Sequence, residues 1–333
     1  MQAIHGVYIH LLIILNYRKD KVFLIFSALM DDMFTAFLTQ VAIQRNKYSA
    51  LEMNPILITN FTNKSHLGTR LFLCFIYLYM GLSLNKIKYI RSLKEKKFRI
   101  EHQVFVAEGS KLVSDLIKNC RCQLLVALPE WISAHPGIQA EEIVVASTRE
   151  LNKATLLKTP PPVIAVFYRP EHAMEQFNAS DQLIMVLDGI QDPGNMGTII
   201  RVADWFGIEH IVCSLDTTDL YNPKTVQATM GAIARAKVIY TDVVDFLRQN
   251  SQFPIYGTFL DGDSIYTEKL SANGIIVMGS EGKGISTEVE KTITHRLLIP
   301  SYPLGATSSE SLNVAAATAV ICSEFRRRRA VTE

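Results

Sequence analysis

The sequence LDGIQDPGNMGTIIRVADWFGI spans residues 187–208 and decides how the rest of the chain is interpreted. An apolar strand ends in it, a turn of Asp, Pro, Gly and Asn follows, and a helix begins. In a parallel α/β sheet such turns lie at the carboxyl edge, where ligands bind. Asn195 can cap this helix, and Arg201 lies six residues further along it. Taken alone, the segment also fits a tight turn with a surface arginine.

A second glycine-bearing segment, VMGSEGKGIS, spans residues 277–286 and also follows an apolar strand. It is not a P-loop, because the four residues before Gly-Lys are missing and Gly284 stands where Ser or Thr would ligate magnesium. No G-x-G-x-x-G follows the first strand, which disfavours a dinucleotide fold. We expect these glycines to let the backbone approach a flat ligand, with the Glu281 carboxylate projecting into the same site.

The third segment, IPSYPLGATSSESLNVAAATAVICSEF, spans residues 299–325. It leaves a predicted strand at Ile299 and Pro300 and opens the last helix, predicted to begin at Ser311. Ser and Asn are ordinary capping residues, and capping alone would explain them. All three segments begin where a predicted strand ends, so we expect them to converge on one rim of the sheet.

The pattern along the chain predicts two α/β domains and a linker. From Leu183 onward strands alternate with helices, which indicates a mostly parallel sheet covered on both faces. Residues 80–168 predict a smaller α/β domain with strands at 104–109, 123–129, 141–147 and 161–167. Residues 169–182 are the expected linker.

Residues 1–79 differ from the rest of the chain. Their apolar islands are interrupted by charges, and none approaches the roughly 20 apolar residues of a membrane-spanning helix. No basic segment precedes the first island, so a signal peptide is a poor match. We expect functional sequence to begin at Met80, with 1–79 an atypical extension; the alternative is a small membrane-associating extension.

The formal net charge is only +2 over 333 residues, so affinity for a polyanion requires local patches. Two basic patches exist: the run Arg326 to Arg329, and a predicted amphipathic helix, Asn85 to Phe98, with its flanks. The second patch contains Lys86, Lys88, Arg91, Lys94, Lys96, Lys97 and Arg99. The five cysteines are odd in number and lack paired metal-ligand spacing, which favours reduced thiols over a disulfide framework or a zinc site.

Together, DPGNMGTIIR, MGSEGKGIS and IP followed by SESLNVAAATA resemble the three motifs of the SpoU (TrmH-type) family of RNA 2′-O-ribose methyltransferases, within the SPOUT superfamily. The resemblance is strong over 183–327 and looser over 80–167. It implies a trefoil-knotted methyltransferase domain at 183–329, preceded at 80–168 by a ribosomal-protein L30e-like domain that binds the RNA substrate. It also implies S-adenosyl-L-methionine as cofactor and a cytoplasmic homodimer, with no metal and no membrane expected.

The resemblance also implies roles for individual residues. The catalytic positions that it indicates are Arg201, Asn195, Glu281, Ser311 and Asn313. The cofactor-binding positions are Thr258, Leu260, Gly262, Gly279, Gly282, Ile299, Pro300 and Leu312. RNA contacts are expected from Lys86, Lys88, Arg91, Lys94 and Arg201. The stretch Ser301 to Ser309 is longer than in the family pattern, which leaves the local fit of that loop in question.

The implied reaction is in-line attack of a ribose 2′-hydroxyl on a sulfonium methyl, in which the protein mainly aligns the reacting groups. A guanidinium holds its proton tightly, so phosphate clamping is the role expected of Arg201, with proton removal as a further hypothesis. Ribosomal RNA is the expected substrate and transfer RNA the alternative. A non-catalytic RNA-binding or ribosome-assembly protein, or methyl transfer to a base nitrogen, are the rival interpretations.

Overall fold

The computed structural model describes residues 10–14, 23–27, 81–174, 177–303 and 311–330. The chain divides into two units, Met1–Lys64 and Ser65–Glu333. In the first unit, β1 (His10–Ile14) and β2 (Phe23–Ser27) form an antiparallel pair. The prediction that residues 1–79 are an extension otherwise falls outside the described ranges. None of the described helices is long and apolar enough to cross a membrane.

The larger sheet of the second unit has the order β12-β10-β11-β7-β8-β9, and each neighbouring pair is parallel. This confirms the predicted mostly parallel α/β fold. The strands are β7 (Leu183–Asp188), β8 (His210–Cys213), β9 (Lys237–Tyr240), β10 (Ile255–Ser264), β11 (Gly274–Gly279) and β12 (His295–Leu298). The helices are α9 (Pro193–Trp205), α10 (Pro223–Ala228), α11 (Val243–Gln249), α12 (Thr287–Glu290) and α13 (Val314–Ala330).

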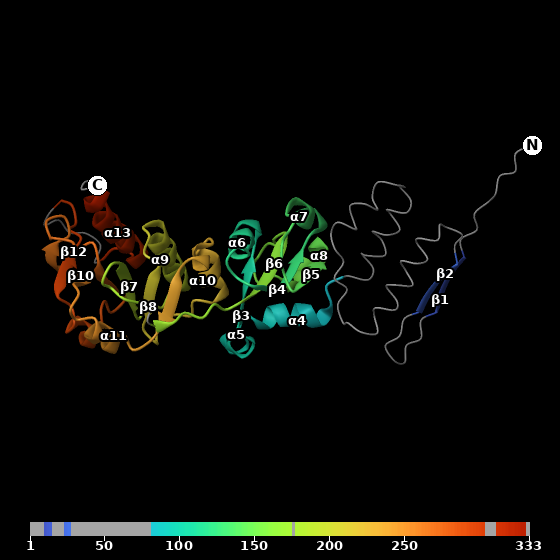
Figure 1. The fold of residues 1–333 in the computed structure, drawn as a ribbon, viewed down its shortest axis with the longest axis horizontal. Helices are drawn as coiled ribbons and strands as arrows, with labels where there is room; N and C mark the ends of the chain where they lie inside the picture. Colours follow the sequence, from blue (N-terminus) through green and yellow to red (C-terminus); the bar gives the residue numbers. More distant parts are fainter. Residues whose placement is uncertain (1–9, 15–22, 28–80, 175–176, 304–310, 331–333) are drawn as a thin grey trace, which may run out of the picture. The chain divides into compact units, whose positions relative to one another are not determined.

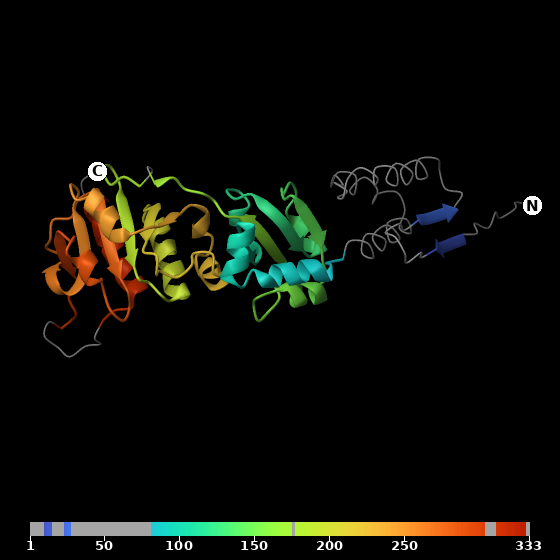
Figure 2. The same ribbon diagram turned by 90° about the horizontal axis from the view of Figure 1, so that it is seen from below.

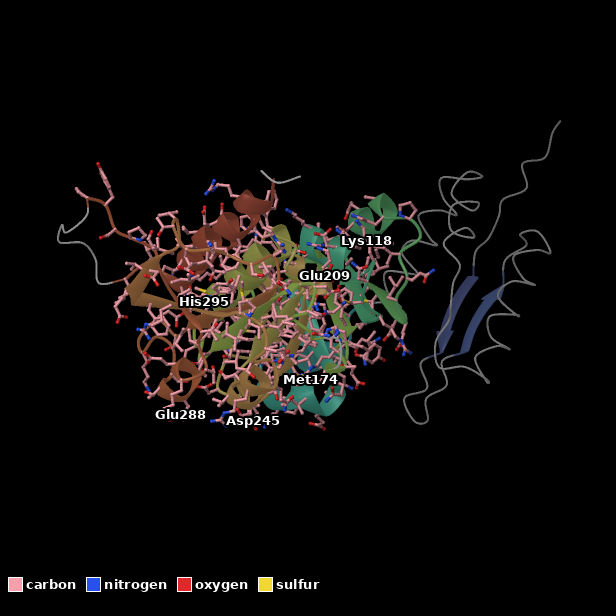
Figure 3. The ribbon with its side chains drawn as sticks, turned by 60° about the vertical axis from the view of Figure 1, so that its left-hand side comes forward. Lys118, Met174, Glu209, Asp245, Glu288 and His295 are labelled. Carbon is pink, nitrogen blue, oxygen red and sulfur yellow. The ribbon has the colours of Figure 1, made fainter. Side chains whose placement is uncertain are left out.

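Helices cover both faces of this sheet, because successive side chains of a strand point to opposite faces. In β7, Met185 packs in the cluster that contains α9 and α13, whereas Ile184 and Val186 pack in the cluster that contains α11 and α12. Figure 1 shows α9 and α13 on one face and α11 on the other. Figure 3 labels Asp245 of α11 and Glu288 of α12 at the same edge of the molecule. Burial on both faces explains why β7 is apolar along its length up to the terminal Asp188.

The smaller sheet, in the order β3-β6-β4-β5, is mixed: only the pair of β4 and β5 is parallel. Figure 2 shows its green strands apart from the yellow-to-red strands of the larger sheet. Its strands are β3 (Val104–Glu108), β4 (Cys122–Ala127), β5 (Glu142–Val145) and β6 (Val163–Tyr168). Its helices are α4 (Leu84–Ser92), α5 (Lys96–His102), α6 (Ser110–Leu116), α7 (Pro129–Ala134) and α8 (Thr148–Ala154).

The predicted single helix from Asn85 to Phe98 is wrong in one respect, because α4 ends at Ser92 and α5 begins at Lys96. The carbonyls of Leu93 and Lys94 accept hydrogen bonds from Nη1 of Arg99, both at 2.7 Å. A guanidinium therefore satisfies backbone acceptors that a continuous helix would have paired internally. Arg99, counted above in a basic surface patch, is buried.

Arg99 also joins the smaller sheet's helices to the segment that precedes α10. Its Nη2 and Nε donate to Asp219 Oδ2 at 2.6 and 3.2 Å. Nearby, the rings of Phe105 and Tyr221 have centroids 5.0 Å apart, and Arg169 stacks over Tyr221 at 4.5 Å. Residues 84–168 and the parallel sheet thus share a packed junction.

Candidate active site at the carboxyl edge of the parallel sheet

Two of the three sequence motifs begin at neighbouring points on the sheet edge. Gly279, the last residue of β11, pairs with Asp188, the last residue of β7. The turn into α9 leaves β7, and the segment VMGSEGKGIS leaves β11. Because parallel strands all end at the same edge, the residues that follow β7 and β11 meet there.

Asn195 connects all three motifs through its side-chain amide. Its Nδ2 donates to Glu281 Oε1 at 2.6 Å, and its Oδ1 accepts from Asn313 Nδ2 at 3.0 Å. Asn313 also caps α13, which begins at Val314 and not at the predicted Ser311, because its Oδ1 accepts from the backbone N–H groups of Ala315 and Ala316 at 3.0 and 3.3 Å. Asn195, Glu281 and Asn313 therefore form one hydrogen-bonded chain, named here the amide network.

Local structure fixes Asn195 at the first turn of α9. The N-cap is Asp192, and not Asn195 as the sequence suggested: Asp192 Oδ1 accepts from the Asn195 backbone N–H at 2.8 Å. The next turn passes close to α10: a Cβ placed on Gly197 would lie 2.5 Å from Ala228 Cβ and 2.7 Å from the Thr225 carbonyl oxygen. Glycine is therefore required at 197 for α9 to pack as it does.

Arg201 and Ser311 are not part of the amide network. The Arg201 side chain extends from the exposed face of α9, and it makes no hydrogen bond or ion pair to any described residue. Ser311 is exposed two residues before Asn313. The Arg201 cation is thus accessible to an incoming anionic group.

The loop after β11 is a tight backbone structure. Ser280 and Gly284 exchange two backbone hydrogen bonds, both 2.9 Å long. A Cβ on Gly279 would lie 2.2 Å from Gly284 C and from Ile285 N, whereas one on Gly282 would meet nothing within 4 Å. Gly279 is needed for packing, while Gly282 leaves open space above the loop.

Asp188 anchors this loop to β7, a role that the motif interpretation missed. Its carboxylate is largely buried, and its Oδ2 accepts from the Ser286 backbone N–H at 2.7 Å. The signal was present in the sequence, because the otherwise apolar strand LIMVLD ends in an acid. Asp188 holds the end of the glycine segment in place.

The expected cofactor wall from Thr258 to Gly262 is a bulge in β10. Thr258 and Asp263 both pair with Leu297 of β12, so residues 259–262 project out of the ladder. Leu260 is 71% exposed there. A Cβ on Gly262 would lie 2.7 Å from the carbonyl oxygen of Arg296.

Arg296 of β12 holds this bulge, and the sequence motifs gave no sign of it. Its Nη2 donates to Asp261 Oδ1 at 2.7 Å and its Nη1 to Glu290 Oε1 at 2.5 Å. The guanidinium also lies 3.6 Å from the centre of the Phe259 ring. The ion pair of Arg296 with Asp261 and its stacking on Phe259 therefore hold the bulge of β10 against β12.

The remaining predicted cofactor residues lie near the same strand ends. Ile299 and Pro300 follow β12 directly and are half-buried, and Leu312 is 52% exposed immediately before Asn313. The unusual stretch Ser301 to Ser309 lies mainly outside the described residues. The predicted cofactor residues thus follow the ends of β11 and β12 or lie in the bulge of β10.

The predicted RNA-binding residues of α4 differ in their surroundings. The Lys86 ammonium is paired with Glu142, and Arg91 Nη1 donates to the Lys153 carbonyl oxygen at 3.2 Å. Lys88 and Lys94 are exposed. Within the described ranges, no group of three or more His, Cys, Asp or Glu side chains could hold a metal ion.

Two family models match parts of this chain. A family model described as the SpoU rRNA Methylase family matches residues 182–323, and one described as an MRM3-like substrate binding domain matches 85–165. The chain is 30% identical over 249 residues to the 23S rRNA (guanosine(2553)-2′-O)-methyltransferase of Bacillus subtilis, which covers 72% of this chain and 96% of the relative.

Solved structures give the same result. A TrmH-family protein of Porphyromonas gingivalis superposes with a TM-score of 0.68 at 43% identity, covering 74% of this chain and 99% of that chain. The AdoMet-bound rRNA methyltransferase of Sinorhizobium meliloti has a TM-score of 0.66 at 28% identity, covering 74% and 97%. By its motifs, its fold and these relatives, the chain belongs to the SpoU rRNA methylase family.

Proposed function

We propose that this protein transfers a methyl group from S-adenosyl-L-methionine to the 2′-hydroxyl of a ribose in ribosomal RNA. The observation that carries the proposal is the amide network, which joins one polar residue from each motif at the carboxyl edge of the sheet. The named activity of the Bacillus subtilis relative and the bound AdoMet of the Sinorhizobium meliloti structure support it.

The residues at the strand ends fit this cofactor. Gly279 brings the backbone of β11 against the following loop at a distance that no Cβ would allow, and Gly282 has open space beside it. The bulge that carries Leu260 forms a second, apolar wall. Flat rings and a polar amino-acid portion need such close backbone together with apolar surface.

When bound, S-adenosyl-L-methionine supplies an electrophilic methyl group, so the chain's own residues mainly bind and orient the RNA. In the proposal Arg201 clamps the phosphate beside the target ribose. Asn195 and Asn313 direct hydrogen bonds to the ribose region, and Glu281 fixes the orientation of the Asn195 amide. Ser311, at the start of the third motif, contacts the same ribose. The exposed Lys88 and Lys94, with Lys86 and Arg91, attract the RNA backbone.

The proposal includes three structural features that the family implies. These are a trefoil knot within residues 183–329, an L30e-like character for residues 80–168, and a homodimer. The outer face of α13 supports the homodimer, because it borders a hollow of about 350 Å³ lined by Tyr266, Ala319, Val320, Ser323 and Glu324. Two of these residues, Ala319 and Ser323, have small side chains, which suits close packing of α13 against a second copy. A cytoplasmic location belongs to the same proposal.

The test is incubation of the full chain with methyl-labelled S-adenosyl-L-methionine and RNA that lacks its natural methylation, followed by size separation and nucleoside analysis. Label in a 2′-O-methylnucleoside of ribosomal RNA supports the proposal, and label in transfer RNA alone corrects the substrate. Label on a base would overturn the ribose assignment. Cofactor and RNA binding without transfer in every RNA fraction would favour a non-catalytic role.

The Arg201 variants sharpen this test. Arg201→Ala should abolish transfer, whereas Arg201→Lys keeps the charge but loses the bidentate phosphate contact, and should retain a small fraction of the activity. Arg248→Ala is the matched control, because Arg248 is also an exposed helical arginine and its helix, α11, lies on the opposite face of the sheet. Its activity should equal that of the wild type.

A further inference from the structure

Helix α9 ends in an indole that nothing in the described chain covers. Trp205 is 84% exposed, whereas Trp131 is 6% exposed, donates from Nε1 to Ser110 Oγ at 3.0 Å and stacks on His135. The chain has only these two tryptophans. An indole combines a large apolar face with a polar edge, so an uncovered one is a ready contact surface.

Trp205 lies on the same face of α9 as Arg201. Side chains four residues apart on a helix are neighbours, with Cβ atoms about 5–6 Å apart. Ile199, Ile200 and Ala203 are fully buried against the sheet, which leaves Arg201 and Trp205 together on the outer face. The indole therefore projects from the same helix face, one turn after the arginine that the proposed function assigns to an RNA phosphate.

The surroundings of Trp205 favour an anionic partner. Arg326 donates from Nε to the Phe206 carbonyl oxygen at 2.7 Å and from Nη2 to the Gly207 carbonyl oxygen at 3.0 Å, so a guanidinium lies at the end of α9. The adjacent acid, Asp204, is paired in bidentate fashion with Arg235 at 2.7 and 2.6 Å. Trp205 thus has Arg201 one turn before it on α9 and Arg326 at the end of the helix. Single-stranded nucleic acid binds to exposed aromatic rings near cations, with bases on the ring and phosphates on the cations.

We infer that Trp205 is a stacking platform for an unpaired RNA base next to the nucleotide whose phosphate Arg201 holds. The inference rests on the proposed function, because it assumes RNA at Arg201. It adds a positioning residue outside the three motifs and indicates that the substrate is locally single-stranded at this point. Stacking tolerates any base, so Trp205 contributes affinity and register but no strict base preference.

Intrinsic fluorescence provides the first test. Single-stranded RNA oligonucleotides of mixed sequence should quench the emission of the wild-type protein, because the exposed indole stacks on a base. Trp205→Phe leaves Trp131 in its native place, and RNA should leave the emission of that variant unchanged. Equal quenching in both proteins would overturn the inference.

Affinity provides the second test. Trp205→Ala should bind RNA about 5- to 150-fold more weakly, and Trp205→Phe should fall between it and wild type. Affinity for S-adenosyl-L-methionine should not change in either variant. Sedimentation should give all three proteins the same mass. If Trp205→Ala instead changes the mass and leaves RNA affinity intact, the indole contacts a second copy and the inference fails.

The two proposals fail separately. If Trp205→Ala transfers methyl groups to ribose and binds RNA as tightly as wild type, the stacking role of Trp205 is refuted and the proposed function stands. If RNA quenches Trp205 fluorescence but no RNA is methylated, the proposed methyl transfer is refuted and the RNA-binding surface at the end of α9 stands.

Discussion

Arg99 and Asp219 form a buried ion pair, with Nη2 and Oδ2 2.6 Å apart, at the junction of the smaller domain and the parallel sheet. The Arg99 side chain is 3% exposed and also donates to two backbone carbonyls between α4 and α5. All three guanidinium nitrogens of Arg99 therefore donate a hydrogen bond, so none is left unpaired in the protein interior. Such a pair fixes one arrangement of the chain segments that it joins.

Removal of this guanidinium should be strongly destabilising. Arg99→Ala leaves the Asp219 carboxylate and two carbonyl oxygens without their donor, which costs about 3–5 kcal/mol when one partner of a buried pair is lost. Urea unfolding followed by circular dichroism would measure it. Arg121→Ala is the matched control, because the Arg121 side chain is 76% exposed and its pair with Glu141 is worth about 0–1 kcal/mol. Equal losses in the two variants would contradict the structure.

Glu281→Gln should reduce turnover while leaving the fold intact. The charged hydrogen bond to Asn195 becomes a neutral one, and the difference of about 1–1.5 kcal/mol corresponds to a rate reduction of about 5- to 10-fold. Since Glu281 is exposed, the thermal midpoint should stay close to that of wild type. A labelled-methyl assay at saturating RNA tests this, and an unchanged kcat would show that the network is not used in the reaction.

Gly279 and Gly282 should respond differently to replacement by alanine. Gly279→Ala places a Cβ 2.2 Å from the backbone at Gly284 and Ile285, so the loop must move. Overpacking of this kind costs about 1–3 kcal/mol, and the displaced backbone should weaken cofactor binding. Gly282→Ala meets nothing within 4 Å and should leave stability unchanged. Thermal unfolding and titration calorimetry with S-adenosyl-L-methionine would test both variants.

His210 should make the fold less stable in acid. Burial lowers its pKa from the ordinary 6.5, and the positive charges of Lys237 and His172 act in the same direction, while Glu209 and Asp181 oppose them. Between pH 6.5 and the lowered pKa, the unfolded chain therefore binds a proton at His210 that the folded chain does not bind. Stability contributed by neutral His210 is complete above pH 6.5 and is lost as pH falls through its lowered folded pKa.

Replacement of this imidazole tests the cause. Neither ring nitrogen of His210 has a hydrogen-bond partner among the described residues, and the ring packs edge-on against Phe177 at 4.9 Å. His210→Phe keeps the size and packing but cannot take a proton, so its unfolding midpoint should fall less between pH 7 and pH 5. An identical pH dependence in wild type and variant would assign the effect to other groups, His172 among them, because its pKa is also lowered by burial.

The strand ends were predictable from sequence because apolar runs stop abruptly at turn residues. Asn195 and Glu281 follow β7 and β11, and parallel pairing of those strands is enough to bring them near each other. The hydrogen bond between Asn195 and Glu281 therefore agrees with the convergence of these two motifs that the sequence predicts. Arg201, the residue expected to clamp a phosphate, is exposed on α9 and makes no hydrogen bond to the amide network.

Other features depend on contacts between distant residues and left no local pattern. The break between α4 and α5 depends on Arg99, whose carboxylate partner lies 120 residues away. The bulge in β10 is defined by its pairing with β12 and by Arg296, and neither residue spacing nor composition encodes that register. Hydrophobic periodicity reports only on neighbouring residues within one helix or strand, so it cannot predict ion pairs between distant residues.

The double use of Asn313 sets an order of events during synthesis. Its Oδ1 caps α13 by accepting from Ala315 and Ala316, and its Nδ2 holds Asn195, which was made 118 residues earlier. A growing chain on the ribosome can therefore pair its six strands before this network can close. The proposed active site is therefore complete only once α13 is present, so a truncated chain that already has the sheet should not transfer methyl groups.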